Sequence, residues 1–213
     1  MLNAGMSGVP FVTYDMSCYH YASPVPTPVA VRNRRTGSVD LTRSVPAGRD
    51  EETVYRPYSR KLPIDAEQRL FLRGLEFTAY SPCIQTHGNV RHPFEFDDAT
   101  RALYVKYAAL HKSLAGEISA ASRRAAQTGE PVVRPLVWDY QDDANTWDVA
   151  DEYIFCGRRL VAPVLADVAA RDVYLPQGVW EEEGSGVRHV VSADGKRLRV
   201  DVPVDGIAVF VKK

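Results

Sequence analysis

Two polar side chains, Asp15 and His87, each come directly after a short apolar run, in "GVPFVTYD" and "SPCIQTH". Residues at the carboxyl ends of parallel strands converge on one rim of an α/β barrel, so both side chains could face one pocket. A carboxylate and an imidazole there would exchange hydrogen bonds and protons with a ligand. Two simpler interpretations stay open: a turn or helix cap for Asp15, and a structural role for His87.

Other kinds of catalytic or metal site find no support in the sequence. Cys18, Cys83 and Cys156 lie far apart without a CxxC pair, which predicts buried free thiols rather than a zinc site or a disulfide framework. No nucleophile-elbow or cysteine-protease signature accompanies a serine or a cysteine. No metal-ligand spacing appears either, so we expect neither a metal nor another cofactor.

The composition is that of an ordinary globular protein. Of the 213 residues, 45% are apolar and 25% are charged, with a formal net charge of −1. Because acids and bases are interspersed, nothing favours a nucleic-acid partner or an anionic membrane. No apolar run approaches the roughly 20 residues of a membrane span, and "MLNAGMSG" lacks the order of a secretory signal. The cellular compartment stays unknown.

The first 140 residues alternate between strand and helix patterns. Apolar runs and helical periodicity predict strands and helices in the order strand 8–15, helix 65–81, strand 81–88, helix 97–127 and strand 131–140. Gly129 and Pro131 supply the end of the second helix. Strands that alternate with helices in this way imply a parallel sheet with helical crossovers.

Two other regions have a different character. Residues 23–63 are rich in proline, arginine and small polar residues, which predicts a long loop or insertion. After Tyr140, short apolar runs bounded by glycine, aspartate or proline predict an antiparallel β-sandwich. We therefore expect an α/β part over residues 1–145, with the insertion at 23–63, and an all-β part over residues 146–213.

Five segments together resemble glycoside hydrolase family 31, the α-glucosidases and α-xylosidases. They are "AGMSGVPFVTYDMSCY", "LRGLEFTAYSPCIQTHG", "HPFEFDD", "GEPVVRPLVWDYQDDANTWDVADEYIFCGRRLVAPVL" and "RDVYLPQGVW", and they occur in the family's order. The run from Gly129 to Pro163 is the most specific of them. The resemblance implies the C-terminal part of a (β/α)8 TIM barrel, from the helix before roughly the sixth strand, followed by a partial β-sandwich domain.

The resemblance also implies roles for individual residues. The family hydrolyses α-glycosidic bonds with retention by means of two aspartates. Both would lie upstream of Met1, in the missing N-terminal part of the same barrel, so we expect no catalytic residue in this chain. Asp15 matches a supporting acid of the sugar pocket, Tyr19 matches its aromatic wall, and His87 matches a histidine that binds sugar hydroxyls. The implied partner is an α-linked oligosaccharide or glycoside.

Several positions depart from the family's pattern. Ser17 and Cys18 stand where two glycines are usual, Gln85 stands where an arginine is common, and Phe94 replaces a frequent tryptophan. These departures bear on which sugar is bound, and less on the fold.

Three hypotheses about function follow from the resemblance. The first is a C-terminal fragment of a retaining α-glycosidase, inactive alone because three strands cannot close an eight-stranded barrel. Its exposed sheet edge would also make the isolated chain prone to aggregate. The second is a natural truncated protein that binds carbohydrate without catalysis. The third is a fragment that is complemented by a separately encoded N-terminal half.

Overall fold

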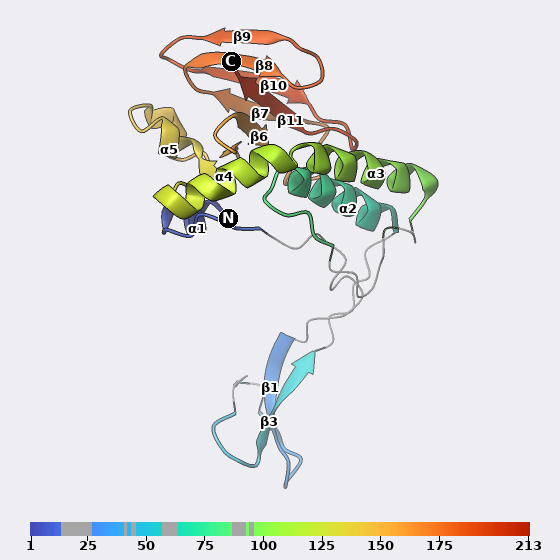
Figure 1. Ribbon diagram of the computed structural model, residues 1–213. Coiled ribbons are helices and arrows are strands. Elements are labelled where there is room, and N and C mark those ends of the chain that lie inside the picture. The colour runs from blue at the N-terminus through green and yellow to red at the C-terminus, as the bar shows by residue number, and fades with distance from the viewer. Residues whose placement is uncertain (14–26, 41, 44–45, 57–63, 87–92, 94–95) are drawn as a thin grey trace.

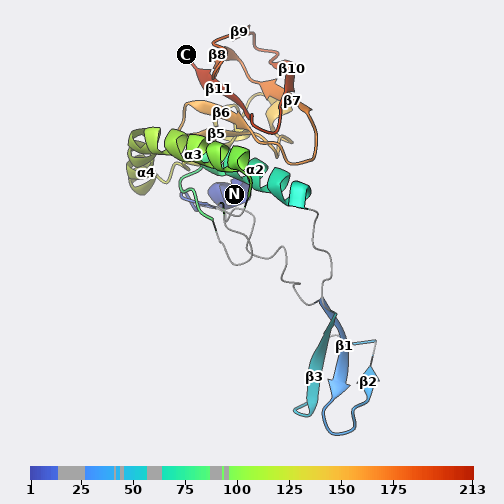
Figure 2. The same ribbon diagram turned by 90° about the vertical axis from the view of Figure 1, so that its right-hand side faces the viewer.

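The computed structural model describes the chain except for residues 14–26, 41, 44–45, 57–63, 87–92 and 94–95. Its larger part has three layers: a helical layer, a six-stranded sheet and a two-stranded ribbon (Figures 1 and 2). The short helix α1 (Leu2–Met6) lies beside the helical layer. No helix among the described residues is long and apolar enough to cross a membrane.

The helical layer consists of α2 (Ile64–Ala79), α3 (Asp98–Ser113) and α4 (Ala115–Thr128). Helix α3 begins where the Asp97 carboxylate accepts a hydrogen bond of 2.8 Å from the Thr100 amide, and α4 ends at Gly129 in a left-handed conformation. The helix predicted over 97–127 is therefore interrupted, at Leu114. Phe71 and Leu75 of α2 are fully buried in the core that these helices share with the sheet.

The six-stranded sheet is antiparallel throughout, with the strand order β4-β5-β6-β11-β8-β9. Its strands are β4 (Val133–Pro135), β5 (Tyr153–Phe155), β6 (Arg159–Ala162), β8 (Gly178–Glu182), β9 (Arg188–Val191) and β11 (Ala208–Lys212). The ribbon pairs β7 (Ala170–Leu175) with β10 (Lys196–Asp201), also antiparallel. The described fold is thus largely sheet, with helices on one side.

Strict alternation along the central strands gives the sheet two buried faces. Val161 of β6 and Val209 of β11 point into the core shared with the helices. Their neighbours Leu160 and Phe210 point into a second core, which includes the ribbon. Successive side chains of a strand face opposite sides of the sheet, so apolar residues in an unbroken run serve both cores.

The parallel arrangement predicted for the first 140 residues does not form among the described residues. The strand predicted over 131–140 is limited to β4 and pairs antiparallel with β5, and the helix α5 (Leu136–Asp139) follows it at once. Residues 8–13 are not in a strand, and only Thr86 of the described part of 81–88 makes a bridge. An apolar run looks the same in a parallel strand and in a buried antiparallel one, which explains the wrong prediction for β4.

Part of the region predicted as a long loop or insertion forms a small sheet, so this part is not a loop. Strands β1 (Thr27–Asn33), β2 (Val39–Asp40) and β3 (Glu51–Arg56) pair antiparallel in the order β2-β1-β3. The turn after β1 is closed by the Asn33 side chain, whose Oδ1 accepts hydrogen bonds from the backbone amides of Arg35 and Thr36. In both ribbon views this small sheet stands apart from the three layers (Figures 1 and 2).

Candidate functional site

The three residues predicted to bind sugar, Asp15, Tyr19 and His87, lie outside the described residues. The described segments before two of them do meet. The Thr13 hydroxyl donates a hydrogen bond of 3.0 Å to the carbonyl oxygen of Cys83. This contact joins the segment that leads into Asp15 to the segment that leads into His87.

A third segment runs beside the first. The Val132 amide donates a hydrogen bond of 2.9 Å to the carbonyl oxygen of Pro10. Helix α1 packs closely on β4, because a Cβ added to Gly5 would lie 3.2 Å from the carbonyl oxygen of Val133. The beginning of the chain is therefore placed against the first strand of the large sheet.

A largely apolar cavity of about 780 Å³ opens between α1, α2 and the segment after α5. Phe77 and Tyr153 form part of its wall, with ring centroids 5.7 Å apart. Trp147 stands at the cavity with 63% of its surface exposed, and its indole N–H donates to the Gln141 carbonyl oxygen at 2.9 Å. The lining carries two carboxylates, Asp148 and Asp151, and Asp151 bonds to the Arg171 guanidinium at 2.8 Å.

Most carboxylates near the helix and sheet interface are paired with arginine. Arg134, on β4, bonds to Glu130 and, at 2.8 Å, to Asp139. Arg159, on β6, bonds to Glu117 of α4 and contacts Glu183 at 3.3 Å. Both guanidinium groups are about nine-tenths buried, where an unpaired charge would be costly. These acids therefore hold elements together.

Two other glutamates are buried almost completely, Glu76 at 1% and Glu152 at 3% exposure. Burial raises the pKa of Glu152 to about 7, although the Tyr174 amide donates to this carboxyl at 2.9 Å. Burial likewise raises the pKa of Glu76 to about 8 against the opposing effect of Arg73. Neither carboxyl can reach a substrate from the interior, so their protonation affects the fold rather than a reaction.

Among the described residues, no group of three His, Cys, Asp or Glu side chains could hold a metal ion. Cys83 and Cys156 are free thiols, and Cys156 is buried as predicted, whereas Cys83 is partly exposed. Burial also raises the pKa of the Cys156 thiol to about 12, which keeps it protonated and unreactive. Cys18 lies outside the described residues.

The polar groups that sequence reasoning missed are Arg73, Glu76 and Glu152. Arg73 and Glu76 are three residues apart, and this spacing is usual for an ion pair on a solvent-exposed helix face. A signal was nevertheless present, because the buried residues Phe71, Leu72 and Leu75 surround this pair in the sequence. Helical periodicity alone places Glu76 next to the apolar face of α2.

Gly157 lies next to the Arg134 guanidinium, and a substitution there tests how closely the backbone packs on this group. Its φ is +75°, and an added Cβ would lie 3.3 Å from Arg134 Nη2 and 3.5 Å from Arg124 Nη2. We expect Gly157→Ala to lower the free energy of unfolding by about 2 kcal/mol, through backbone strain and a small displacement of the Arg134 guanidinium.

Gly129→Ala is the matched control, since Gly129 has a φ of +77° and nothing within 4 Å of an added Cβ. It should cost only the strain, about 1 kcal/mol. Urea unfolding of both variants measures the difference. Equal losses would mean that contact with the guanidinium groups contributes nothing.

Comparison with known proteins gives a consistent result. Residues 129–213 match the family model described as the glycosyl hydrolase family 31 C-terminal domain. A sulfoquinovosidase of Agrobacterium fabrum is 34% identical over 149 residues, which cover 67% of this chain and 22% of that protein. An α-xylosidase of Saccharolobus solfataricus is 28% identical over 151 residues, covering 69% of this chain and 20% of that protein.

A solved structure is also similar over the whole chain. The crystal structure of a GH31 α-xylosidase from a soil metagenome, complexed with xylose, has a TM-score of 0.72 at 22% identity. The match covers 100% of this chain and 29% of that one, and at this identity it is evidence for the fold alone. The chain spans about a fifth of the length of the curated relatives that it matches.

Proposed function

This chain belongs to glycoside hydrolase family 31, and on that premise we propose that it supplies part of the sugar pocket of a retaining α-glycosidase. Its substrates are α-linked glucosides or xylosides. The barrel that would carry the pocket is the (β/α)8 TIM barrel, of which residues 1–145 provide the C-terminal part. Residues 146–213 belong to the β-sandwich that follows.

One observation carries the binding part of this proposal, the hydrogen bond of 3.0 Å from Thr13 to the Cys83 carbonyl. Asp15 is two residues beyond Thr13, and His87 is four residues beyond Cys83. A chain advances at most about 3.6 Å per residue, so this contact limits how far apart the two residues can lie, and it supports the proposal that both contact one sugar. The proposal places them around its hydroxyls, with Tyr19 beside the ring.

The chemistry of these three residues suits a sugar. The Asp15 carboxylate accepts hydrogen bonds from hydroxyl groups, and the His87 imidazole can both donate and accept. The Tyr19 ring would cover the apolar C–H surface of the sugar. The proposal assigns neither the nucleophile nor the general acid to these groups, because a retaining mechanism uses two aspartates that the resemblance matches to no residue of this chain.

The first test is an assay of the 213-residue chain on an aryl α-glucoside. We expect no hydrolysis, because the proposal assigns neither of the two catalytic carboxylates to this chain. Turnover that is abolished in Asp15→Asn would contradict this expectation. The assay needs a monomeric sample, because an exposed sheet edge favours aggregation.

A second test separates the glycosidase from a non-catalytic carbohydrate-binding protein or a complementing fragment. An antibody against residues 155–213 measures the mass of the native polypeptide. A species several hundred residues longer supports the glycosidase. A species near 23.7 kDa, together with sugar affinity that is lost in His87→Ala, supports the binding protein. Activity that appears only with a separately encoded N-terminal half supports the complementing fragment.

A further inference from the structure

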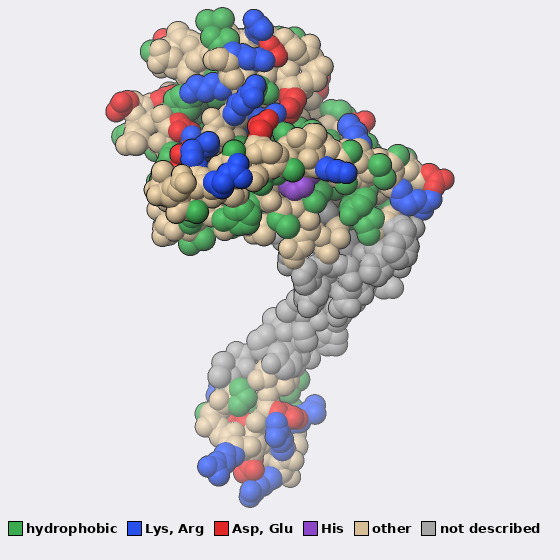
Figure 3. Space-filling model, in the orientation of Figure 1, with side chains coloured by type: hydrophobic (Ala, Val, Ile, Leu, Met, Phe, Trp, Pro, Cys, Tyr) green, Lys and Arg blue, Asp and Glu red, His purple; other side chains and the backbone are tan. Residues whose placement is uncertain are grey.

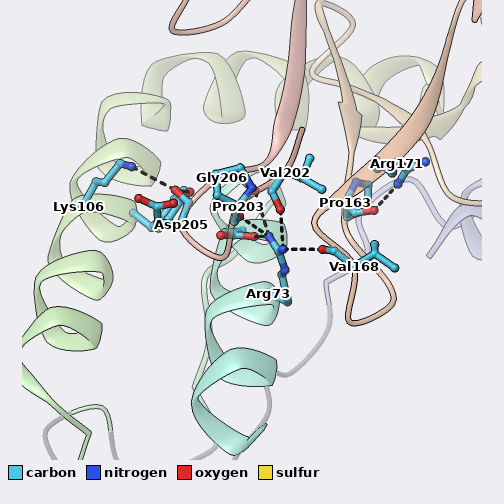
Figure 4. Close-up of polar contacts among 11 residues, drawn as sticks. Arg73, Lys106, Pro163, Val168, Arg171, Val202, Pro203, Asp205 and Gly206 are labelled. Carbon is cyan, nitrogen blue, oxygen red and sulfur yellow. Dashed lines mark hydrogen bonds and ion pairs between the residues drawn. The ribbon is translucent and has the colours of Figure 1, made fainter. Parts of the chain in front are cut away.

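One arginine of the helical layer contacts both strands of the β7–β10 ribbon at one end of the ribbon, where β7 begins and β10 ends. Arg73 projects from α2 toward the loop that joins β10 to β11 (Figure 4). Its Nη2 donates to the carbonyl oxygens of Val202, at 2.8 Å, and Val168, at 3.2 Å. Val168 lies just before β7 and Val202 just after β10. Two hydrogens on Nη2 thus meet two acceptors, and this nitrogen is satisfied.

The other terminal nitrogen of Arg73 has more acceptors than hydrogens. Nη1 lies 2.8 Å from the Pro203 carbonyl oxygen, 3.1 Å from the Gly206 carbonyl oxygen and 3.0 Å from Glu76 Oε2. It carries only two hydrogens, so three acceptors compete for them. Which acceptors receive the two Nη1 hydrogens depends on how strong a hydrogen-bond acceptor each of the three oxygens is.

Glu76 is the acceptor whose strength can change. The second oxygen of its carboxyl, Oε1, is buried and has no hydrogen-bond partner in the described part of the chain. The groups around it come from three elements: Arg73 of α2, Lys106 and Tyr107 of α3, and Asp205 of the loop. An ionised carboxylate forms hydrogen bonds roughly twice as strong as a neutral acceptor does.

We propose that Glu76 is a proton switch that controls how strongly Arg73 Nη1 binds the Pro203 and Gly206 carbonyls of the loop between β10 and β11. With Glu76 protonated, the Nη1 hydrogens go to the Pro203 and Gly206 carbonyls, and the loop is held on α2. When Glu76 loses its proton to solvent, the carboxylate takes one of those hydrogens through Oε2, and the two carbonyls are left to share the other. This inference is independent of the proposed function.

The direction of the pH dependence follows from burial. Burial raises the pKa of Glu76 to about 8 from an ordinary value of 4.5. The folded state therefore binds this proton more tightly than the unfolded state does. The stability that the protonated carboxyl confers is complete below pH 4.5 and is lost as the pH rises through 8. Arg73 Nη1 therefore binds the Pro203 and Gly206 carbonyls fully at neutral pH and less strongly in mild alkali.

The change should stay local, because other contacts hold the surroundings. The Tyr107 hydroxyl donates to the Asp205 carbonyl oxygen at 2.9 Å, and Lys106 Nζ approaches the same oxygen at 3.4 Å (Figure 4). Burial raises the pKa of Tyr107, so this hydroxyl stays protonated in mild alkali. The Nη2 bonds to Val168 and Val202 do not involve Glu76.

The test is a pH titration of the backbone carbonyl carbons in the 13C-labelled chain, from about pH 5.5 to about pH 9.5. We expect the Pro203 and Gly206 carbonyl shifts to titrate together with a midpoint near pH 8, and the Val168 shift to stay constant. In Glu76→Gln both titrations should disappear. Flat Pro203 and Gly206 shifts in the unchanged chain would overturn the proposal, and this measurement does not depend on whether the variant folds.

A matched control uses the other buried glutamate. Glu152 has similar burial, and its Oε2 also lacks a partner among the described residues. It bonds to β7 through the Tyr174 amide and does not touch the loop. Glu152→Gln should leave the Pro203 and Gly206 titrations unchanged. Persistence of these titrations in Glu76→Gln, or their loss in Glu152→Gln, would assign the switch to another group.

Discussion

Arg73→Met is expected to lower the free energy of unfolding by about 3–5 kcal/mol. The substitution keeps a long apolar side chain but removes the donors to four backbone carbonyl oxygens. Glu76, which is 1% exposed and protonated at neutral pH, loses its contact with Nη1 as well, but no unpaired charge is left behind. Buried acceptors without donors incur a desolvation penalty that the unfolded chain avoids. Urea unfolding at neutral pH, followed by circular dichroism, measures the loss.

Two further variants make this result specific. Arg199 lies on the same ribbon and pairs with Asp172 at 3.2 Å, with both side chains about two-thirds exposed. Arg199→Met should therefore change stability by less than about 0.5 kcal/mol. Arg73→Lys should recover only part of the loss, since one ammonium replaces the two nitrogens that reach the carbonyls before β7 and after β10. A loss below about 1 kcal/mol for Arg73→Met would show that the guanidinium contacts are not needed for stability.

Trp180→Ala, which tests the second core, is expected to lower the free energy of unfolding by roughly 3–5 kcal/mol. Trp180, on β8, is fully buried in the core that the sheet shares with the ribbon. Its indole N–H donates to the Pro176 carbonyl oxygen at 2.8 Å, so truncation also leaves a buried acceptor unmet. The midpoint of urea unfolding should fall while the urea dependence stays the same.

Trp147→Ala is the matched control for this variant, because Trp147 is 63% exposed. Its indole bonds to the Gln141 carbonyl at an exposed position, so we expect a loss below about 1 kcal/mol. Equal losses for the two tryptophans would mean that the second core collapses readily around the missing ring. That result would argue against tight packing between the sheet and the ribbon.

The sequence predicted which segments form strands better than it predicted which strands pair with one another. The apolar runs that became β6, β7 and β11 are visible in "RRLVAPVL", "RDVYLP" and "GIAVFVKK". Period and composition identify a buried strand, but they do not say which strand lies beside it. For that reason Val133–Pro135 was assigned to a parallel sheet, although it pairs antiparallel with Tyr153–Phe155. The small sheet at 27–56 was missed because prolines and arginines are typical of loops.

Prediction of the site met a different limit. Strand-end reasoning selected Asp15 and His87, and the hydrogen bond from Thr13 to Cys83 is consistent with their being neighbours. Arg73 and Glu76 could not be found in the same way, because their importance comes from backbone carbonyls far along the chain. A helix pattern gives the direction of a side chain relative to its own helix. It does not reveal the loop that the side chain will contact.

The order of strands in the large sheet has a consequence for the synthesis of this protein. Strand β11 lies between β6 and β8, and Ala208 pairs with Ala162 far earlier in the chain. Figure 3 shows acidic and basic side chains interspersed over the face that it draws, but the edges of β6 and β8 that pair with β11 stay unpaired until β11 has been synthesised. During synthesis, one edge of each strand therefore has unpaired backbone hydrogen-bonding groups, and the apolar side chains of both strands remain exposed. We therefore expect stalled or shortened nascent chains that end before β11 to recruit chaperones, whereas chains that include it escape them.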